Sequence, residues 1–411
     1  MILLATLAVL VFAYSLIGRR LDETVVTGPM LFTLSGIVAA SVAPAEVAVG
    51  VNSKLVLHLA ETGLVLLLFT DAARTDLSSL WSIRGLPARL LGIGLPLTIL
   101  AGAAAAKLVL PDFPVWEAAI LSAVLAPTDA GLGQVIVSDP RTPANVRQAL
   151  NVEAGLNDGL VVPFLLFFIA IAAVEQEGAH ASLMQYIVEQ LGLGVAAGGA
   201  IGLAGGWLLG QAARRGWMSE VLKQAGVVAL PVLCMVASDA AAASMFIAAF
   251  VAGMAVQAGF RDAGTHSLEF GEIWGQVVNL SVFFLFGMFV ARSWHDFTLA
   301  SLAYAVLSLT VVRMLPVAVA MIGGRYRWPT ILFLGWFGPR GLASIVLGLV
   351  YLEREIHLAN ESTFRMAATM TVLLSIFAHG LSARPGVTLY ARAAGNDRTG
   401  TLTAKTSGRD G

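Results

Sequence analysis

The sequence has few charged residues. Asp, Glu, Lys and Arg make up 12% of its 411 residues, whereas a typical soluble domain carries about 25%. The 25 Lys and Arg residues nearly balance the 26 Asp and Glu residues, so the formal net charge is −1. Without a basic excess, the chain has no electrostatic basis for binding nucleic acid. Its single cysteine, Cys234, excludes a disulfide framework and a cysteine-based metal site.

What the sequence has instead is apolar residues, which make up 57% of the chain. The 42 Gly and 15 Pro residues are scattered among apolar stretches, as is common in membrane helices. A soluble domain of this length could not bury so much apolar surface. We therefore expect an all-α polytopic membrane protein whose main partner is the lipid bilayer, with no soluble partner implied.

Apolar stretches of about 20 residues predict about thirteen transmembrane helices. The breaks between these stretches carry Gly, Pro or charged residues. The predicted spans are 2–17, 25–42, 55–72, 86–110, 115–138, 146–174, 184–211, 220–238, 240–258, 267–292, 297–322, 328–353 and 363–390. The first is expected to be a retained helix, because Arg19 and Arg20 follow it, whereas a cleaved signal has its basic residues in front.

The basic residues predict the orientation of these spans. With the N-terminus outside, most of the 25 Lys and Arg residues fall in cytoplasmic segments, as the positive-inside rule requires. We expect an integral plasma (inner) membrane protein with a cytoplasmic C-terminus. The polar residues 391–411 are expected to form a disordered cytoplasmic tail.

Thirteen spans can be divided into six, one linker and six. The second six then run opposite to the first, which is the inverted repeat of many secondary transporters. Spans five and twelve correspond in this arrangement. Each carries proline and polar residues at mid-span, APTDAG at 126–131 and FGPRG at 337–341. Such paired interruptions predict broken helices that form a transport site.

Span five places Thr128 and Asp129 directly after Pro127. Proline removes a backbone donor and so frees carbonyl groups upstream. Freed carbonyls, a hydroxyl and a carboxylate are hard oxygen ligands suited to a small cation. A carboxylate at membrane depth is costly, so Asp129 is predicted to be functional.

Span six carries the richest polar cluster, NVEAGLNDG at 151–159. Asn157 lies one turn after Glu153, whereas Asp158 points about 140° away from Glu153. One carboxylate is thus expected to face an aqueous cavity and the other to face packed protein. A buried guanidinium needs a carboxylate, and we expect Arg340 in span twelve to pair with Glu153, which leaves Asp129 and Asp158 for the cation.

Three further polar residues have less distinctive settings. Arg313 precedes Pro316 and is expected to bind freed carbonyls in a structural role. Asp71 ends span three and is expected to face cytoplasmic water. His379 is expected to be a packed core histidine, although its side chain titrates in the range of a proton relay.

Seven segments together resemble the cation:proton antiporter superfamily, specifically its sodium/proton exchanger branch with an Asn-Asp motif in helix six. The Thr-Asp, Glu-x-x-x-Asn-Asp and Gly-Pro-Arg-Gly elements are specific as a set. The segments are LLLFTDAARTDL at 66–77, LAPTDA at 125–130, SDPRTPANVRQALNVEAGLNDGLVVPF at 138–164, VFFLFGMF at 282–289, VVRMLPVAV at 311–319, GWFGPRGLASIVLG at 335–348 and LLSIFAHGLSARP at 373–385.

The resemblance implies a homodimer whose protomers have two parts. The core transport domain would comprise 86–175 and 297–390, and the dimerisation domain 1–85 and 176–296. It also implies roles for the polar residues. Asp158 would bind both the ion and the proton, Asp129 and Thr128 would complete the metal site, Asn157 would support it, and Glu153 would pair with Arg340.

The function implied is electroneutral exchange of a monovalent cation for H⁺ by alternating access, with Na⁺ first and K⁺/H⁺ exchange as the alternative. Li⁺ is not separable from these by sequence. A cation channel or an organic-anion symporter of related architecture is more remote, because no ring of carbonyls or charges is evident and the polar cluster is acidic. We expect neither an enzyme nor a bound cofactor, since no nucleophile–base pair and no metal constellation is present.

Overall fold

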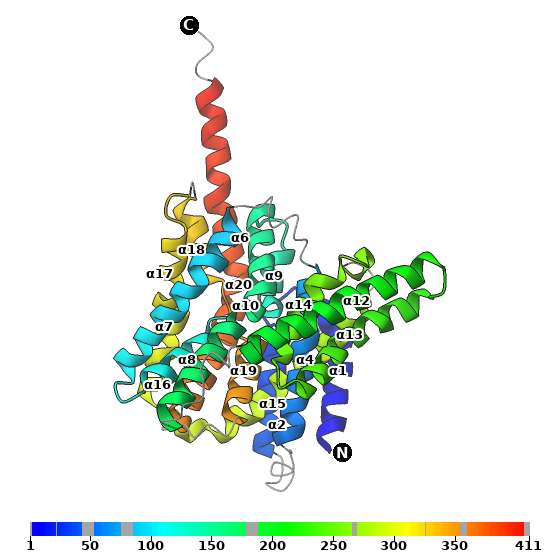
Figure 1. Cartoon of the computed structure of the whole chain (residues 1–411). Coiled ribbons are helices and arrows are strands. Elements are labelled where there is room, and N and C mark those ends of the chain that lie inside the picture. Colours follow the sequence, from blue (N-terminus) through cyan, green and yellow to red (C-terminus); the bar gives the residue numbers. More distant parts are fainter. Residues whose placement is uncertain are drawn as a thin grey trace.

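The computed structural model describes residues 2–21, 23–42, 53–74, 85–177, 188–264, 269–324, 326–353 and 360–406. Within these ranges every regular element is helical (Figure 1). Each predicted span corresponds to one helix or to two or three consecutive helical segments, which confirms an all-α protein with about thirteen membrane-crossing units. Seven of the described helical segments are long and apolar enough to span a bilayer on their own.

Eight spans are single helices. They are α1 (Ile2–Leu21), α2 (Gly28–Val42), α4 (Ser53–Arg74), α10 (Ala144–Glu177), α13 (Glu220–Ala240), α14 (Met245–Val256), α15 (Glu269–Arg292) and α20 (Glu361–Thr406).

Five spans are divided. Two of them contain a short π-helical segment, and three are divided at residues that leave the helix. The segments are α6 (Leu86–Arg89) with Leu90–Gly94 and α7 (Leu95–Val109); Val188–Leu193 with α12 (Gly194–Arg214); α8 (Val115–Leu125) with α9 (Ala130–Ser138); α16 (Leu299–Leu309) with α17 (Val311–Ala320); and α18 (Trp328–Trp336) with α19 (Leu342–Glu353).

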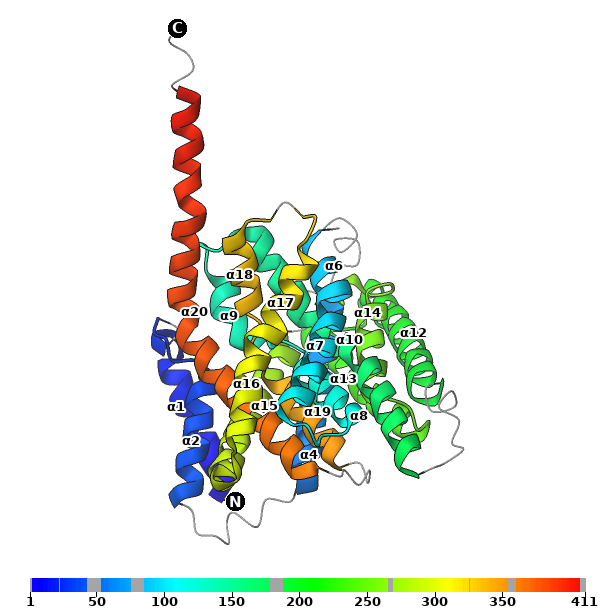
Figure 2. The same cartoon turned by 90° about the vertical axis from the view of Figure 1, so that its left-hand side faces the viewer.

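The C-terminal segment differs from its prediction. Helix α20 continues to Thr406 and projects from the bundle (Figures 1 and 2), whereas the last predicted span ends at residue 390. Residues 407–411 lie outside the described chain. The physical reason is that extending an existing helix adds one hydrogen bond per residue and needs no new nucleus.

Close backbone packing organises the helices that flank the broken ones. Every fourth residue of α12 from Gly194 to Gly210 is a buried glycine. A Cβ at Gly202 would lie 2.7 Å from the Cα of Ala252 on α14, so the two backbones touch. Small residues at this spacing let membrane helices approach closely. Helix α14 packs in turn on α4, and α15 packs on α2 and α4.

The broken helices lie in a second group of contacts. Helix α8 packs between α7 and α10, α17 packs on α18 and α7, and α20 contacts α9, α16, α18 and α19. Figure 2 shows α9 and α18 beside α20. This arrangement places the breaks after α8 and after α18 inside the bundle.

Candidate functional site

The two broken spans meet at their breaks. Helix α8 ends at Leu125, just before Pro127, and α18 ends at Trp336, before Gly338 and Pro339. Proline cannot continue the hydrogen-bond ladder of a helix. The backbone N–H of Asp129 donates to the Pro339 carbonyl at 2.8 Å, so each break supplies a partner that the other needs.

The carboxylate of Asp129 caps two helices at once. Its Oδ1 accepts from the backbone N–H of Leu132 at 3.0 Å, in the first turn of α9. Its Oδ2 accepts from the N–H of Leu342 at 2.7 Å, where α19 begins. Helix N-termini carry unpaired N–H groups and a partial positive charge, and both favour an anion. The break after α8 thus supplies the negative charge for the N-termini of α9 and α19.

The guanidinium of Arg340 does the converse for the helix C-termini. Its terminal nitrogen donates to the carbonyls of Ala126 at 3.1 Å and Gly338 at 3.2 Å, which follow the last residues of α8 and α18. Carbonyl ends of helices attract cations. Arg340 is fully buried, so these carbonyls compensate a charge that would otherwise be costly at membrane depth.

The glycines of the FGPRG motif are required by these side chains. A Cβ at Gly341 would lie 2.6 Å from Cγ of Asp129, and a Cβ at Gly338 would lie 2.5 Å from Nε of Arg313. Real Cβ atoms are essentially never this close to another heavy atom. The absence of a Cβ at Gly341 therefore lets Asp129 approach the break, and its absence at Gly338 does the same for Arg313.

The predicted Glu153–Arg340 ion pair is wrong. Glu153 pairs with Arg313, whose guanidinium nitrogen lies 2.6 Å from Glu153 Oε1 with both side chains almost completely buried. Arg340 binds backbone carbonyls, which is the role expected for Arg313. The two arginines have these partners for a geometric reason. Arg313 lies on α17, next to Glu153, whereas Arg340 lies within the break itself, beside the freed carbonyls.

Thr128 and Asn157 are joined directly. The amide nitrogen of Asn157 donates to the Thr128 hydroxyl oxygen at 2.6 Å, and both side chains are buried. The predicted residues of spans five and six therefore come together. No described residue forms a hydrogen bond with the Asn157 amide oxygen, so this oxygen is available to a ligand.

Asp158 lies in a cavity of about 220 Å³ that Asp129 also lines. Unlike Asp129, it has a buried carboxylate oxygen, Oδ1, that no described residue hydrogen-bonds. The cavity lies between the C-terminal end of α4, helix α9 and the N-terminal halves of α10 and α15. This arrangement can bind a cation between carboxylate and backbone oxygens within reach of water.

The cavity also includes polar residues that sequence analysis did not place there. Asp71 lines it and packs on Gly155, whose added Cβ would lie 3.4 Å from the Asp71 Cβ. Gln276 and Asn279 of α15 contribute amide groups. Asp71 was expected to face cytoplasmic water. The LLLFTDAARTDL motif that carries it was the available signal, whereas α15 offers no sequence pattern that distinguishes its two amides.

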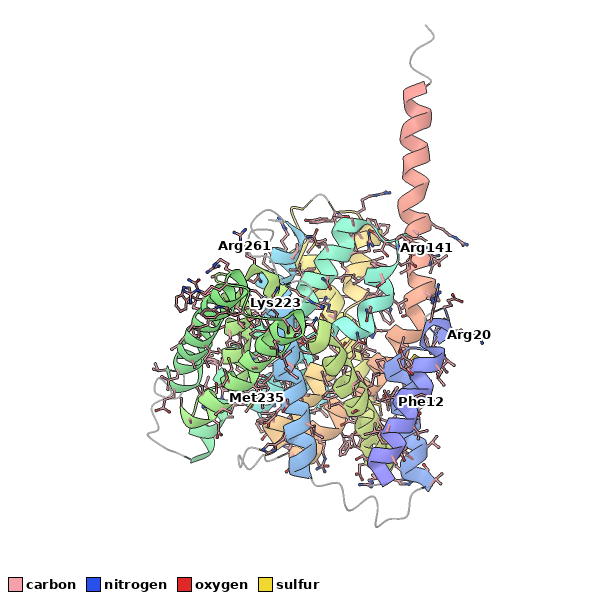
Figure 3. All side chains as sticks on the ribbon, turned by 90° about the vertical axis from the view of Figure 1, so that its right-hand side faces the viewer. Phe12, Arg20, Arg141, Lys223, Met235 and Arg261 are labelled. Carbon is pink, nitrogen blue, oxygen red and sulfur yellow. The ribbon has the colours of Figure 1, made fainter. Side chains whose placement is uncertain are left out.

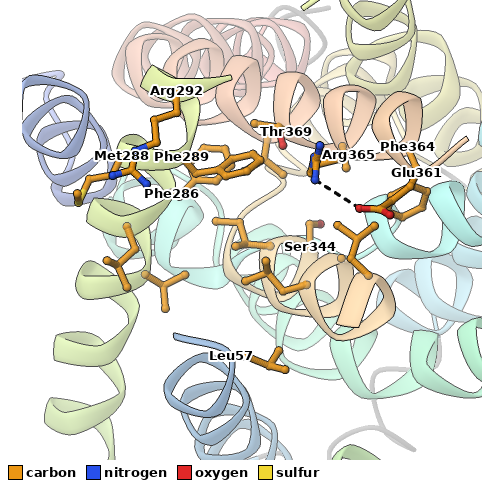
Figure 4. A pocket seen from close by; sticks show the side chains of 18 residues that line it. Leu57, Phe286, Met288, Phe289, Arg292, Ser344, Glu361, Phe364, Arg365 and Thr369 are labelled. Carbon is orange, nitrogen blue, oxygen red and sulfur yellow. Dashed lines mark hydrogen bonds and ion pairs between the residues drawn. The ribbon is translucent and has the colours of Figure 1, made fainter. Parts of the chain in front are cut away.

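A second cavity of about 420 Å³ lies between α15, α19 and the start of α20 (Figure 4). Most of its lining is apolar, with Arg292, Arg365 and Glu361 among the polar exceptions. Arg365 and Glu361 form an ion pair at 3.4 Å, with both side chains partly exposed. None of the predicted ion-binding residues lines this cavity, so it does not belong to the same site.

Comparison with known proteins matches residues 4–388 to the family described as sodium/hydrogen exchanger, transmembrane. The K(+)/H(+) antiporter NhaP2 of a Shewanella species is 25% identical over 273 residues, which are 64% of this chain and 45% of the relative. A Na(+)/H(+) antiporter of Schizosaccharomyces pombe is 23% identical over 300 residues, which are 64% of this chain and 62% of the relative. The chain thus spans about half the length of these curated relatives.

A solved structure has the same fold. The sodium proton antiporter MjNhaP1 from Methanocaldococcus jannaschii at pH 8 superposes with a TM-score of 0.71 over 92% of this chain and 99% of the other, at 17% identity. This likeness covers most of both chains, so it shows the fold independently of the motifs.

Proposed function

The chain belongs to the sodium/hydrogen exchanger family, and we propose that it exchanges a monovalent cation, Na⁺ first, for H⁺ across the membrane. The observation that carries the proposal is the contrast between two carboxylates near the breaks after α8 and α18. Asp158 lies in a cavity, and one of its carboxylate oxygens forms no hydrogen bond with any described residue. The carboxylate of Asp129, which lines the same cavity, instead accepts from two backbone N–H groups.

The mechanism is competition for one carboxylate. A cation and a proton both neutralise Asp158, so the binding of either excludes the other. The empty, ionised site carries a charge that is costly to move through the membrane interior. The site can therefore switch from one side of the membrane to the other only when it holds a cation or a proton. This restriction couples the cation flow to the proton flow.

The cation is transported cargo and not a resident metal. Asp158 and Asp129 would supply negative charge, and Thr128 an oxygen ligand oriented by the Asn157 amide. Asn157 supports the site because its own amide oxygen lies in the same cluster. Carboxylate, hydroxyl and carbonyl oxygens suit hard cations. The relatives named for Na⁺ and for K⁺ keep K⁺/H⁺ exchange as the second candidate.

The orientation is part of the proposal. In Figure 3, the labelled basic side chains lie nearer the end from which α20 projects than the labelled apolar ones do. They are Arg20, Arg141, Lys223 and Arg261, against Phe12 and Met235. Basic residues favour the cytoplasmic side, so we assign that end, the C-terminus and the Asp158 cavity to the cytoplasm of a plasma (inner) membrane.

The helix contacts also support the proposed division of the chain. Segments 86–175 and 297–390 contain the helices around the breaks after α8 and α18, and they would move together as the transport domain. Segments 1–85 and 176–296 contain α2, α4 and α12–α15 and would form the dimerisation domain of a homodimer.

Exchange is proposed to be electroneutral. Glu153 is paired with Arg313, and Asp129 is capped by two helix termini, so neither needs to take up a proton during the cycle. One cation then replaces one proton. A membrane potential would otherwise contribute about 2.3 kcal/mol per charge per 100 mV. The endpoint of exchange should therefore not shift when a potassium-diffusion potential is imposed.

Proteoliposomes with a preset ΔpH test the exchange itself. Added Na⁺ should dissipate the gradient, and K⁺ and Li⁺ in parallel samples rank the cations. Dissipation that needs no cation, or current that grows with voltage without a turnover limit, would favour a leak or a channel and contradict the proposal.

A further inference from the structure

The break after α18 needs partners from outside its own span. Two of its backbone groups, the Trp336 carbonyl and the Arg340 N–H, flank residues 337–339, where the chain is not helical. A buried backbone group without a partner is costly. Both groups have partners on α20, which packs beside α18 (Figure 2). The Trp336 carbonyl also accepts from the Gly338 N–H at 2.9 Å, so α20 provides the contact that ties this carbonyl to a second helix.

The partners are Ser375 and His379, four residues apart and so on one face of α20. The Arg340 N–H donates to the Ser375 hydroxyl oxygen at 2.6 Å. His379 Nε2 lies 2.9 Å from the Trp336 carbonyl oxygen. Since a carbonyl can only accept, Nε2 carries the hydrogen.

The two side chains also contact each other. Because the ring hydrogen is on Nε2, Nδ1 of His379 accepts from the Ser375 hydroxyl, whose oxygen lies 3.1 Å away. Both side chains are buried, at 0% exposed for Ser375 and 2% for His379. One continuous set of polar contacts therefore runs from one end of the break to the other through α20.

The atoms between these two anchors are those that hold Asp129. The Pro339 carbonyl accepts from the Asp129 N–H, and the Leu342 N–H donates to its carboxylate. Moving the break relative to α20 would displace both contacts. An apolar side chain at position 375 would leave the Arg340 N–H without its partner on α20. An apolar side chain at position 379 would leave the Trp336 carbonyl with the Gly338 N–H alone, which lies within the break itself.

We propose that Ser375 and His379 are positioning residues for cation binding. They fix the break at 337–341 so that the N-terminus of α19 stays in register with Asp129. Neither residue touches the cation. The inference rests on the proposed function, because it assigns these residues to the cation site of an exchanger.

The test compares the cation concentration at half-maximal exchange (KM) with the maximal rate in proteoliposomes. Ser375→Ala and His379→Leu each remove one contact with the break, which should raise KM about tenfold, the effect of one net hydrogen bond. The maximal rate should stay within about twofold of wild type. His379→Gln places an amide donor near the Nε2 position and should restore KM, whereas the shorter His379→Asn should not.

Thr371→Ala is the matched control. Thr371 is a buried hydroxyl one turn earlier on α20, and it donates only to the Ala367 carbonyl of its own helix. This variant should keep the wild-type KM. An unchanged KM in Ser375→Ala and His379→Leu, or an equal rise in Thr371→Ala, would overturn the proposal.

Hydrogen–deuterium exchange keeps the test independent of transport. Peptides covering 337–345 should exchange about tenfold faster in Ser375→Ala and His379→Leu, near the wild-type rate in His379→Gln, and at the wild-type rate in Thr371→Ala. Unchanged protection in the first two variants would also overturn the proposal. Wild-type liposomes without any exchange would instead reject the proposed function, and the protection data would still decide whether the contacts fix the break. If His379→Leu does not fold, His379→Asn is the variant that decides.

Discussion

Asp129 and Asp158 line one cavity, yet the fold surrounds them in opposite ways. Each oxygen of Asp129 accepts a backbone N–H, one from α9 and one from α19. Asp158 has a buried oxygen that no described residue hydrogen-bonds. The difference arises because Asp129 lies in a break, beside two helix N-termini, whereas Asp158 lies within the continuous helix α10.

The contrast separates two tasks that a carboxylate can perform in a membrane. Asp129 joins the two breaks, and its charge is compensated by the N-termini of α9 and α19. Asp158 keeps its hydrogen-bonding capacity for something that is not part of the chain. We therefore expect the exchangeable proton and the cation to compete for Asp158.

The largest expected effect is that of Asp158→Asn. We expect exchange to fall by about 100-fold or more, because the amide can neither carry the proton nor neutralise a cation. Stability should be unchanged or higher, since the substitution removes a charge from the membrane interior without stranding a partner. Cation-driven ΔpH dissipation and thermal unfolding in detergent measure the two effects. Substantial exchange by a folded variant would remove Asp158 from the mechanism.

Removing one member of the Glu153–Arg313 pair should have the next largest effect. Either Glu153→Gln or Arg313→Gln strands a buried charge, which costs about 3–5 kcal/mol of unfolding free energy. The double variant should cost less than the sum of the two. A double-mutant cycle in detergent measures the coupling, and the same cycle with Arg340 is the control. Stronger coupling of Glu153 to Arg340 would contradict the assigned pair.

Asp129→Asn should have a smaller effect on stability, in the direction opposite to Asp158→Asn. An amide can accept from one of the two N–H groups, but its nitrogen then faces the other donor. The unpaired N–H should lower the free energy of unfolding by about 1–3 kcal/mol. Thermal unfolding of both Asn variants side by side checks this. If the two variants were equally stable, the claim that only Asp129 has a structural role would be contradicted.

The smallest expected effect lies outside the membrane, at the pair that Asp139 and Arg141 form in the turn after α9. The Arg141 guanidinium, at 2.7 Å, holds the pKa of the Asp139 carboxyl below its usual value. The Asp139–Arg141 pair therefore stabilises the folded protein above the unfolded pKa of Asp139, about 3.9. This stabilisation disappears as the pH falls through the folded pKa of Asp139. Arg141→Ala should be slightly less stable than wild type at neutral pH and equal to it in strong acid. A difference that grows in acid would reverse the sign.

Hydropathy and proline were sufficient to predict the spans and the breaks after α8 and α18, but not the division between α16 and α17 at Thr310. Pro127 and Pro339 lie where α8 and α18 have already ended, because the missing N–H of proline is a local property that sequence shows directly. The helical continuation of α20 past residue 390 was missed, since polar composition does not show that an existing helix can extend.

The partners of the two buried arginines could not be predicted in the same way. Arg313 and Arg340 both lie inside spans, and which one reaches Glu153 depends on how α17 and the break are rotated about their axes. The spacing of Gly338 and Gly341 contained the answer, but only the three-dimensional contacts show which side chains those glycines admit. Asp71 was missed for a related reason, because the end of a span can face either bulk water or a cavity.

The most direct test of the central claim is proton release upon cation binding to the purified protein in weakly buffered detergent solution. Binding to an ionisable ligand releases the proton that the ligand held. We predict that about one proton is released per cation bound by the wild type, none by Asp158→Asn, and about one by Asp129→Asn. Release that persists in Asp158→Asn, or that is lost only in Asp129→Asn, would contradict the assignment of proton and cation to Asp158.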